Sequence, residues 1–156
     1  MEDLSSAASE PLMAILAQRV DEQRADLLDR YVSVLREALF SSRAQVRPSA
    51  LKQIAAEEAE ALLYFLRQAG FSAAKRGAQL HQAGLNARAV LRLNQVTRQF
   101  LLAGLENHHI VSVLDIVDAY ELATVEGFIQ SIDDAHQVAR GELERVLHAL
   151  HQRGDK

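Results

Sequence analysis

The 156-residue chain contains no cysteine, only two prolines and only seven glycines. Without cysteine, neither a disulfide framework nor a thiolate metal site can form. Alanine, leucine, glutamine, glutamate and arginine, which favour helices, are abundant, whereas the β-branched and aromatic residues that favour strands are scattered. This composition predicts an all-α fold. With 49% hydrophobic residues, the chain is long enough for one domain with a hydrophobic core, but not for two.

The sequence also lacks a strong excess of either charge and any long apolar run. A net charge of −4 gives no basic face of the kind that binds phosphates, so no interaction with nucleic acid is expected. The longest uninterrupted apolar stretch, Ala61–Leu66, is too short to span a bilayer. The N-terminus MEDLSSAASE has neither the basic start nor the apolar run of a secretory signal. We therefore predict no membrane insertion and a cytoplasmic location.

Capping residues and prolines divide the chain into five or six predicted helices. Residues 1–8 are predicted to form a flexible N-terminus that precedes a single domain of residues 9–156. Ser9 is the expected N-cap of a first helix that runs to about Phe40, with Pro11 in its first turn. Three further helices are expected at residues 48–69, closed by Gly70 as a left-handed C-cap, at 72–84, capped by Ser72, and at 86–105, capped by Asn86.

The most informative segment runs from about Ser112 to Gln152, where no proline interrupts a predicted last helix capped by Ser112. Such a helix would be roughly 60 Å long, about twice the diameter of a small domain, so one body could not cover it. Whether Gly127 or Gly141 bends this helix is left open by the sequence. Its apolar stripe follows steps of three or four residues: Val117, Tyr120, Thr124, Phe128, Ile132, Ala135, Ala139, Leu143, Val146 and Leu150.

The uncovered stripe predicts a homodimer in which two last helices pair. A helix covered entirely by the first and fourth helices of its own domain is the alternative. Because small residues let two helices approach closely, Gly127→Leu is predicted to weaken dimerisation. The predicted interface positions are Tyr120, Ala123, Gly127, Phe128, Ser131 and Ala135, with Val146 and Leu150 in an exit seam that has two-helix spacing.

Three segments carry a resemblance to a known group of proteins: RPSALKQIAAEEAEALLYFLRQAG (47–70), RGAQLHQAGLNARAVLRLNQVTRQFLLAGL (76–105) and VEGFIQSIDDAHQVARGELERVLHAL (125–150). They resemble the helical N-terminal domain of bacterial multidomain signalling proteins, which include stressosome sensors with a C-terminal STAS domain, that is, anti-sigma-factor antagonists, and some sensor histidine kinases. The resemblance implies a dimer of globin-like or bundle-like helices without haem, whose last helix runs toward an output domain. It carries over no catalytic residue. Because no STAS, GAF, PAS or kinase domain follows, either an excised domain or a member that acts alone is expected.

Histidines are the candidate metal ligands. His148 and His151 lie three residues apart on a helix, but no carboxylate is spaced to complete a set of four ligands, so a solvated helix flank is expected. Glu106 and His109 form a single E-x-x-H, whereas carboxylate-bridged di-iron bundles use this element twice. Haem would need one proximal histidine, such as His81 or His136, and is disfavoured. The other histidine is His108.

Three neighbouring carboxylates, Glu57, Glu58 and Glu60, suggest acid–base chemistry, since paired carboxyl groups can separate their pKa values. No nucleophile is placed to work with them, so a solvated helix face is predicted. We therefore expect a non-enzymatic, cofactor-free sensory or regulatory dimerisation module that passes a signal through its C-terminal helix to an output domain or partner. The alternatives are a stand-alone adaptor for a separate kinase or phosphatase and a haem- or metal-binding helical protein.

Overall fold

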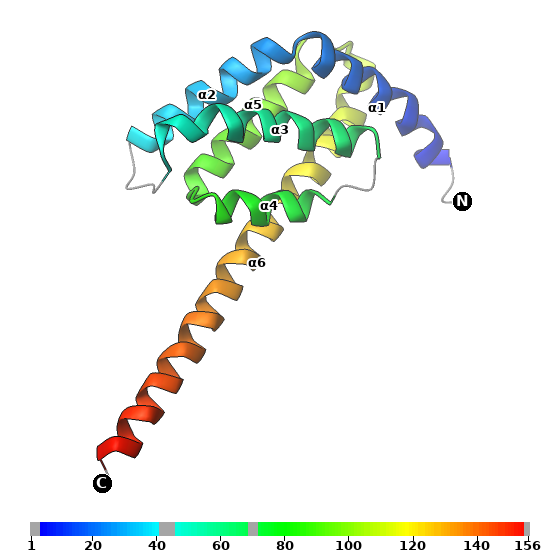
Figure 1. Cartoon of the computed structure of the whole chain (residues 1–156). Helices are drawn as coiled ribbons and strands as arrows, with labels where there is room; N and C mark the ends of the chain where they lie inside the picture. The colour runs from blue at the N-terminus through cyan, green and yellow to red at the C-terminus, as the bar shows by residue number, and fades with distance from the viewer. Residues whose placement is uncertain (1–3, 41–45, 69–71, 155–156) are drawn as a thin grey trace.

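The computed structural model describes residues 4–40, 46–68 and 72–154, and within them every regular element is a helix. The predicted all-α fold with a long C-terminal helix is confirmed. None of the helices in these described ranges is both long and apolar enough to cross a membrane. The elements are α1 (Leu4–Glu22), α2 (Arg24–Phe40), the short 3₁₀ helix η1 (Pro48–Ala50), α3 (Leu51–Leu66), α4 (Ala73–Gln82), α5 (Ala87–Leu102) and α6 (Asn107–Gly154). Figure 1 labels the α-helices.

The predicted caps of α4 and α5 are confirmed. The Ser72 hydroxyl accepts a hydrogen bond from the backbone N–H of Lys75 at 3.4 Å, and the Asn86 side-chain oxygen accepts one from the N–H of Ala89 at 2.9 Å. Short polar side chains in extended backbone satisfy the free N–H groups of a first helical turn. At the other end of α4, Gly84 has a φ of +89° and forms a Schellman motif, in which the N–H of Leu85 donates to the carbonyl of Leu80.

The predicted first helix is two helices. The chain turns at Gln23, and α1 and α2 lie at an angle to each other over the body (Figure 1). A straight helix over residues 4–40 would be about 55 Å long and would leave one half of its apolar stripe in water. Ser9 is not an N-cap, because α1 begins at Leu4 within the predicted flexible N-terminus, and Pro11 lies inside the helix.

Two other predicted boundaries also move. Pro48 begins the 3₁₀ turn η1, and α3 starts only at Leu51. The last helix begins at Asn107 rather than at Ser112, so the predicted Ser112 cap is wrong. The same helix continues without a break through Gly127 and Gly141, since one glycine costs a helix only about 1 kcal/mol. The predicted C-cap at Gly70 lies outside the described residues.

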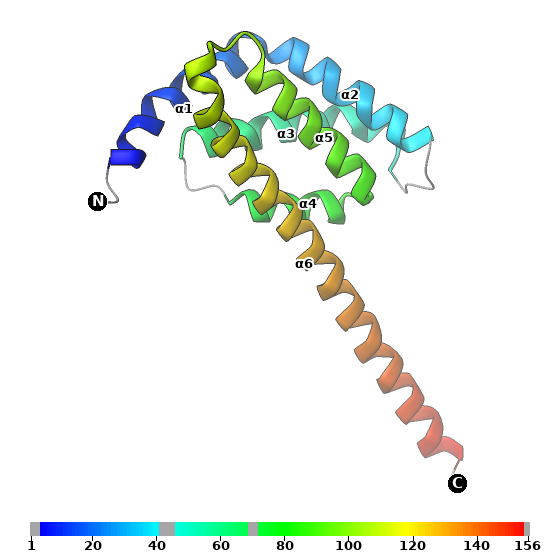
Figure 2. The same ribbon diagram turned by 180° about the vertical axis from the view of Figure 1, so that it is seen from behind.

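The core is formed by apolar faces of all six α-helices, but α6 contributes only its first half. Val113, Val117, Tyr120 and Phe128 of α6 are buried, together with residues such as Leu62 of α3. No residue from 129 to 153 is buried. Figures 1 and 2 show this half of α6 projecting away from the body. These 25 residues span about 38 Å of helix. A large part of α6 therefore lies outside the body of its own domain.

Candidate functional site

The point at which α6 leaves the body is a close crossing with α4, visible in Figure 2. Gly77 of α4 faces α6, and a Cβ atom added to it would lie 1.9 Å from the carbonyl oxygen of Thr124. Gly127 of α6 faces α4, and its added Cβ would lie 1.8 Å from the carbonyl oxygen of Ala74. Glycine lets the two backbones touch. The crossing therefore fixes α6 against α4 through main-chain contact.

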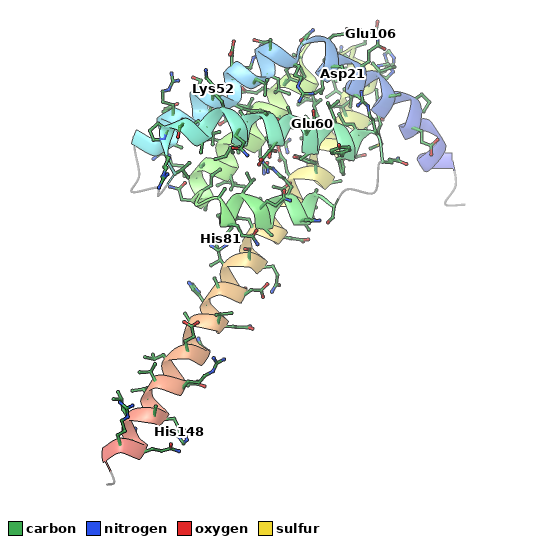
Figure 3. All side chains as sticks on the ribbon, viewed as in Figure 1. Asp21, Lys52, Glu60, His81, Glu106 and His148 are labelled. Atoms are coloured by element: carbon green, nitrogen blue, oxygen red, sulfur yellow. The ribbon has the colours of Figure 1, made fainter. Side chains whose placement is uncertain are left out.

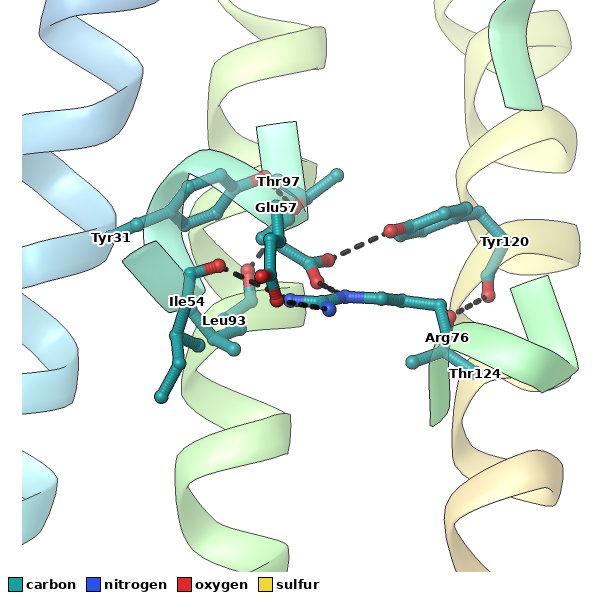
Figure 4. Close-up of polar contacts among 9 residues, drawn as sticks. Tyr31, Ile54, Glu57, Arg76, Leu93, Thr97, Tyr120 and Thr124 are labelled. Atoms are coloured by element: carbon teal, nitrogen blue, oxygen red, sulfur yellow. Dashed lines mark hydrogen bonds and ion pairs between the residues drawn. The ribbon is translucent and has the colours of Figure 1, made fainter. Parts of the chain in front are cut away.

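Next to this crossing lies a buried ion pair. Glu58 of α3 is fully buried, and its Oε2 accepts a hydrogen bond from Nε of Arg76 of α4 at 2.7 Å. Its other oxygen, Oε1, accepts from the hydroxyl of Tyr120 of α6 at 2.7 Å. Arg76 also donates from Nη2 to the carbonyl oxygen of Ile54 at 3.2 Å, and its Nη1 lies 3.5 Å from Oε2 of Glu57 (Figure 4). These contacts join α3, α4 and α6 at one point.

A second buried hydrogen bond lies between two other core helices, α2 and α5. The hydroxyls of Tyr31 of α2 and Thr97 of α5 lie 2.7 Å apart, and Thr97 also donates to the carbonyl of Leu93 at 3.2 Å. Burial, and secondarily the Glu58 carboxylate, raise the pKa of Tyr31 and of Tyr120 well above the ordinary value. Both tyrosines therefore stay protonated in the folded protein and keep their hydroxyl donors.

The raised tyrosine pKa values predict loss of stability at alkaline pH. Above about pH 10 the unfolded chain releases tyrosine protons that the folded chain retains, so the free energy of unfolding falls by up to about 1.4 kcal/mol per pH unit for each group. This stability is fully present below pH 10. Urea unfolding at several pH values above 10 measures how steeply the free energy of unfolding falls with pH. This slope should be about 1.4 kcal/mol per pH unit shallower for Tyr120→Phe than for the parent. Equal slopes would contradict the assignment.

Glu58 is the residue that sequence reasoning placed wrongly. The predicted solvated acidic face holds for Glu57 and Glu60, whose side chains are partly exposed, but not for Glu58. A sequence signal was present, because Glu58 lies four residues after Ile54 and four before Leu62, on the apolar side of α3. Its partners Arg76 and Tyr120 come from distant parts of the chain, so no local pattern could identify them.

From Leu122 to Leu150, α6 carries a surface stripe with alternating steps of three and four residues, apolar except for His136, in which Val125 and Ile132 are half-buried. This is the a/d spacing of a left-handed coiled coil. Leu122, Ile129, Leu143, Val146 and Leu150 are each at least half exposed. We call the full set of nine positions the α6 seam: Leu122, Val125, Ile129, Ile132, His136, Ala139, Leu143, Val146 and Leu150.

The body end of the α6 seam continues onto α5. Leu91 of α5 is 59% exposed and lines a shallow groove together with Leu122 and Val125. Arg98 of α5 binds the Glu121 carboxylate with two hydrogen bonds, from Nε at 3.1 Å and from Nη2 at 2.7 Å, and thereby holds α6 at the edge of this groove. The apolar surface therefore begins on the body at Leu91 and continues along α6 to Leu150, with His136 within it.

The structure divides the predicted interface residues into two groups. Tyr120, Gly127 and Phe128 are buried in contacts with their own domain, and Ala123 is half-buried. This corrects their predicted place on a face open to a second subunit, because α3 and α4 already cover it. Ser131 is half-buried and hydrogen-bonded to His81. The other three predicted positions, Ala135, Val146 and Leu150, are exposed, and the last two lie on the α6 seam.

Sequence reasoning missed Leu122, Val125 and Ile129, which form the body end of the α6 seam. Residues 113–128 carry two apolar stripes, one toward the core and one toward solvent. Helical periodicity finds both but does not say which one the domain covers. The stripe predicted from the sequence followed the core-facing positions as far as Phe128 and reached the α6 seam only at the half-buried Ile132.

The histidines are dispersed. His81 lies where α6 emerges from the body and His148 near its far end, as Figure 3 shows. Nδ1 of His81 lies 2.7 Å from the hydroxyl of Ser131, and its ring meets that of Phe128 edge-on at 5.6 Å. In the described ranges, no three residues among histidine, aspartate and glutamate are grouped to hold a metal ion. His81 therefore acts as a link between α4 and α6.

Comparisons with protein-family models, with curated proteins and with solved structures give no match for this chain. Its function has to be inferred from the geometry of α6 and from the contacts that hold it.

Proposed function

We propose that this chain is a non-catalytic sensory or regulatory module that forms homodimers through the α6 seam and transmits a signal along α6. The observation that carries the proposal is the uncovered seam on a continuous 48-residue helix. The resemblance to N-terminal domains of bacterial signalling proteins supports the same function, with a cytoplasmic location and an output domain or partner protein at the end of α6.

The exposed half of α6 supports dimerisation because a single helix in water is marginally stable. From Leu122 to Leu150 the α6 seam covers four heptads, and each buried leucine or valine contributes roughly 1.5–3 kcal/mol relative to the exposed side chain. A parallel pair fits the surface best. In that arrangement the groove beside Leu91 and Leu122 meets its own copy across the two-fold axis, so body and helix share one interface.

Signal transmission is supported by the contacts that hold α6 in the body. The glycine crossing couples any movement of α4 directly to α6, and the Glu58–Arg76–Tyr120 contacts couple α3 to both. Closely packed helices change arrangement by small translations and rotations rather than by continuous deformation. A partner or ligand that favours one arrangement would shift the population of α6 positions.

The dimer is tested by substitution within the α6 seam. Leu143→Glu places a charge in the middle of the proposed helix pair, where desolvation is costly, and should convert a dimer into a monomer at low micromolar concentration. Light scattering measures the mass, and circular dichroism checks that the body remains folded. Val138→Glu is the matched control. Val138 is 63% exposed on the same helix, but it lies about 140° from Leu143 around the axis. A monomeric parent, or equal effects of both variants, would contradict the proposal.

A further inference from the structure

A second surface of α6 lies beside the α6 seam and shares Ala139 with it. Where α4 and α6 diverge, they enclose an open groove with a volume of about 860 Å³. Its apolar lining consists of short side chains from both helices, such as Ala78 of α4 and Ala135 of α6, together with Val138. Val138 is 63% exposed, and pairing through the seam would leave it uncovered. We call this surface the α4–α6 groove.

The charges of the groove are of one sign. Glu126, Asp134 and Glu142 line it, and no lysine or arginine does. None of these three carboxylates takes part in an ion pair within the described part of the chain, and Asp134 accepts one hydrogen bond, from Gln130 at 2.9 Å. Asp134 and Glu142 lie eight residues apart, which is about 12 Å along a helix and about 80° around its axis, whereas Glu126 lies about 160° around the axis from Glu142. The groove thus combines an apolar floor with a series of negative charges.

We propose that the α4–α6 groove binds a basic amphipathic helix of a partner protein, about four turns long. The lining of α6 extends from Glu126 to Glu142, about 24 Å, which matches a helix of 16 residues. Small side chains on both walls allow a third helix to pack closely, and its lysines or arginines would pair with Asp134 and Glu142. His81 and Gln82 at the α4 side supply polar contacts at one end.

The groove shares Ala139 with the α6 seam, whereas its other α6 residues, such as Asp134 and Val138, lie outside the seam. This inference goes beyond the proposed dimerisation and does not depend on it. If α6 moves relative to α4, the groove changes shape. Occupation of the groove would therefore favour the arrangement of α4 and α6 that fits the bound helix.

The probe for this site is a fluorescently labelled 16-residue synthetic helix with alanine and leucine on one face and lysines spaced seven or eight residues apart. A second peptide with glutamate in place of lysine is its control. Fluorescence anisotropy with the full chain should show binding of the lysine peptide that weakens as salt concentration rises. Replacing Asp134 and Glu142 together by lysine should lower the affinity about fivefold to tenfold, since each exposed ion pair contributes up to about 1 kcal/mol.

Two control variants separate the possible results. Asp133→Lys changes the charge next to Asp134, but Asp133 does not line the groove, so the affinity should change less than twofold. Leu143→Glu should abolish dimerisation and leave peptide binding intact. Equal binding of both peptides, or equal effects of the Asp133 and Asp134/Glu142 variants, would overturn the proposal. The proposal would also be overturned if the Asp134/Glu142 variant, but not the Asp133 variant, changed the oligomeric mass of the protein. That result would mean that a second copy of the chain occupies the groove.

Discussion

Replacing Arg76 by methionine should lower the free energy of unfolding by about 3–5 kcal/mol, because it leaves the Glu58 carboxylate buried without its cation. A buried charge that loses its partner keeps its full desolvation cost, whereas the parent offsets that cost with the Arg76 ion pair and the Tyr120 hydrogen bond. Urea unfolding followed by circular dichroism measures the loss. A change below about 1 kcal/mol would mean that water reaches Glu58.

The control for this prediction removes all three polar groups together. Glu58→Met, Arg76→Met and Tyr120→Phe combined leave no buried charge and no hydroxyl without an acceptor, and the apolar replacements are similar in size to the groups they replace. Replacing a complete buried ion pair by apolar residues is often neutral or stabilising. We therefore expect the triple variant to be more stable than Arg76→Met alone. If it is less stable, loss of packing rather than loss of charge pairing explains the single variant.

Gly127→Ala should have the second large effect, a loss of about 3 kcal/mol or more, because its Cβ would lie 1.8 Å from the main-chain carbonyl oxygen of Ala74. A main-chain atom cannot move aside as a flexible side chain can, so α4 and α6 would have to separate. Gly77→Ala meets the carbonyl of Thr124 in the same way and should behave alike. Thermal unfolding measures both variants.

Gly141→Ala is the matched control, because nothing lies within 4 Å of its added Cβ. In this exposed part of the helix, alanine should raise stability by about 0.5–1 kcal/mol. If Gly127→Ala and Gly141→Ala changed the stability in the same direction, the two helices at the crossing would be further apart than described. The comparison also changes the meaning of Gly127→Leu. A leucine at position 127 would first push α4 away from α6, so a loss of dimer in that variant would be an indirect effect. Leu143→Glu is therefore the better test of the dimer.

The parts of the fold that the sequence predicted correctly depend on short-range physics. The side-chain oxygens of Ser72 and Asn86 cap their helices by accepting hydrogen bonds from N–H groups three residues later, and proline-free segments give long helices. The turn at Gln23 was missed because no glycine or proline marks it. There the tertiary contacts of α1 and α2 prevail over local helix propensity.

The candidate site depends on long-range contacts and was predicted only in part. Glycine at position 127 suggested close helix approach, and close approach is present, but α4 of the same chain provides it. Val146 and Leu150 were predicted from their spacing alone, and both are exposed in the structure. To place Glu58 in the core and Leu122 on the surface, one has to know which face of each helix meets the core. Helical periodicity alone does not contain this information.

The rigid continuity of α6 has a mechanical consequence. The part of α6 beyond Gly127 would act as a lever about 38 Å long with its pivot at the Gly77–Gly127 crossing, so a tilt of about 10° there would displace the far end by roughly 6–7 Å. Rearrangements too small to disturb the interior of the domain would thus become displacements comparable to the width of a helix. Two levers joined side by side would cancel opposing tilts and respond only to motions that both copies share.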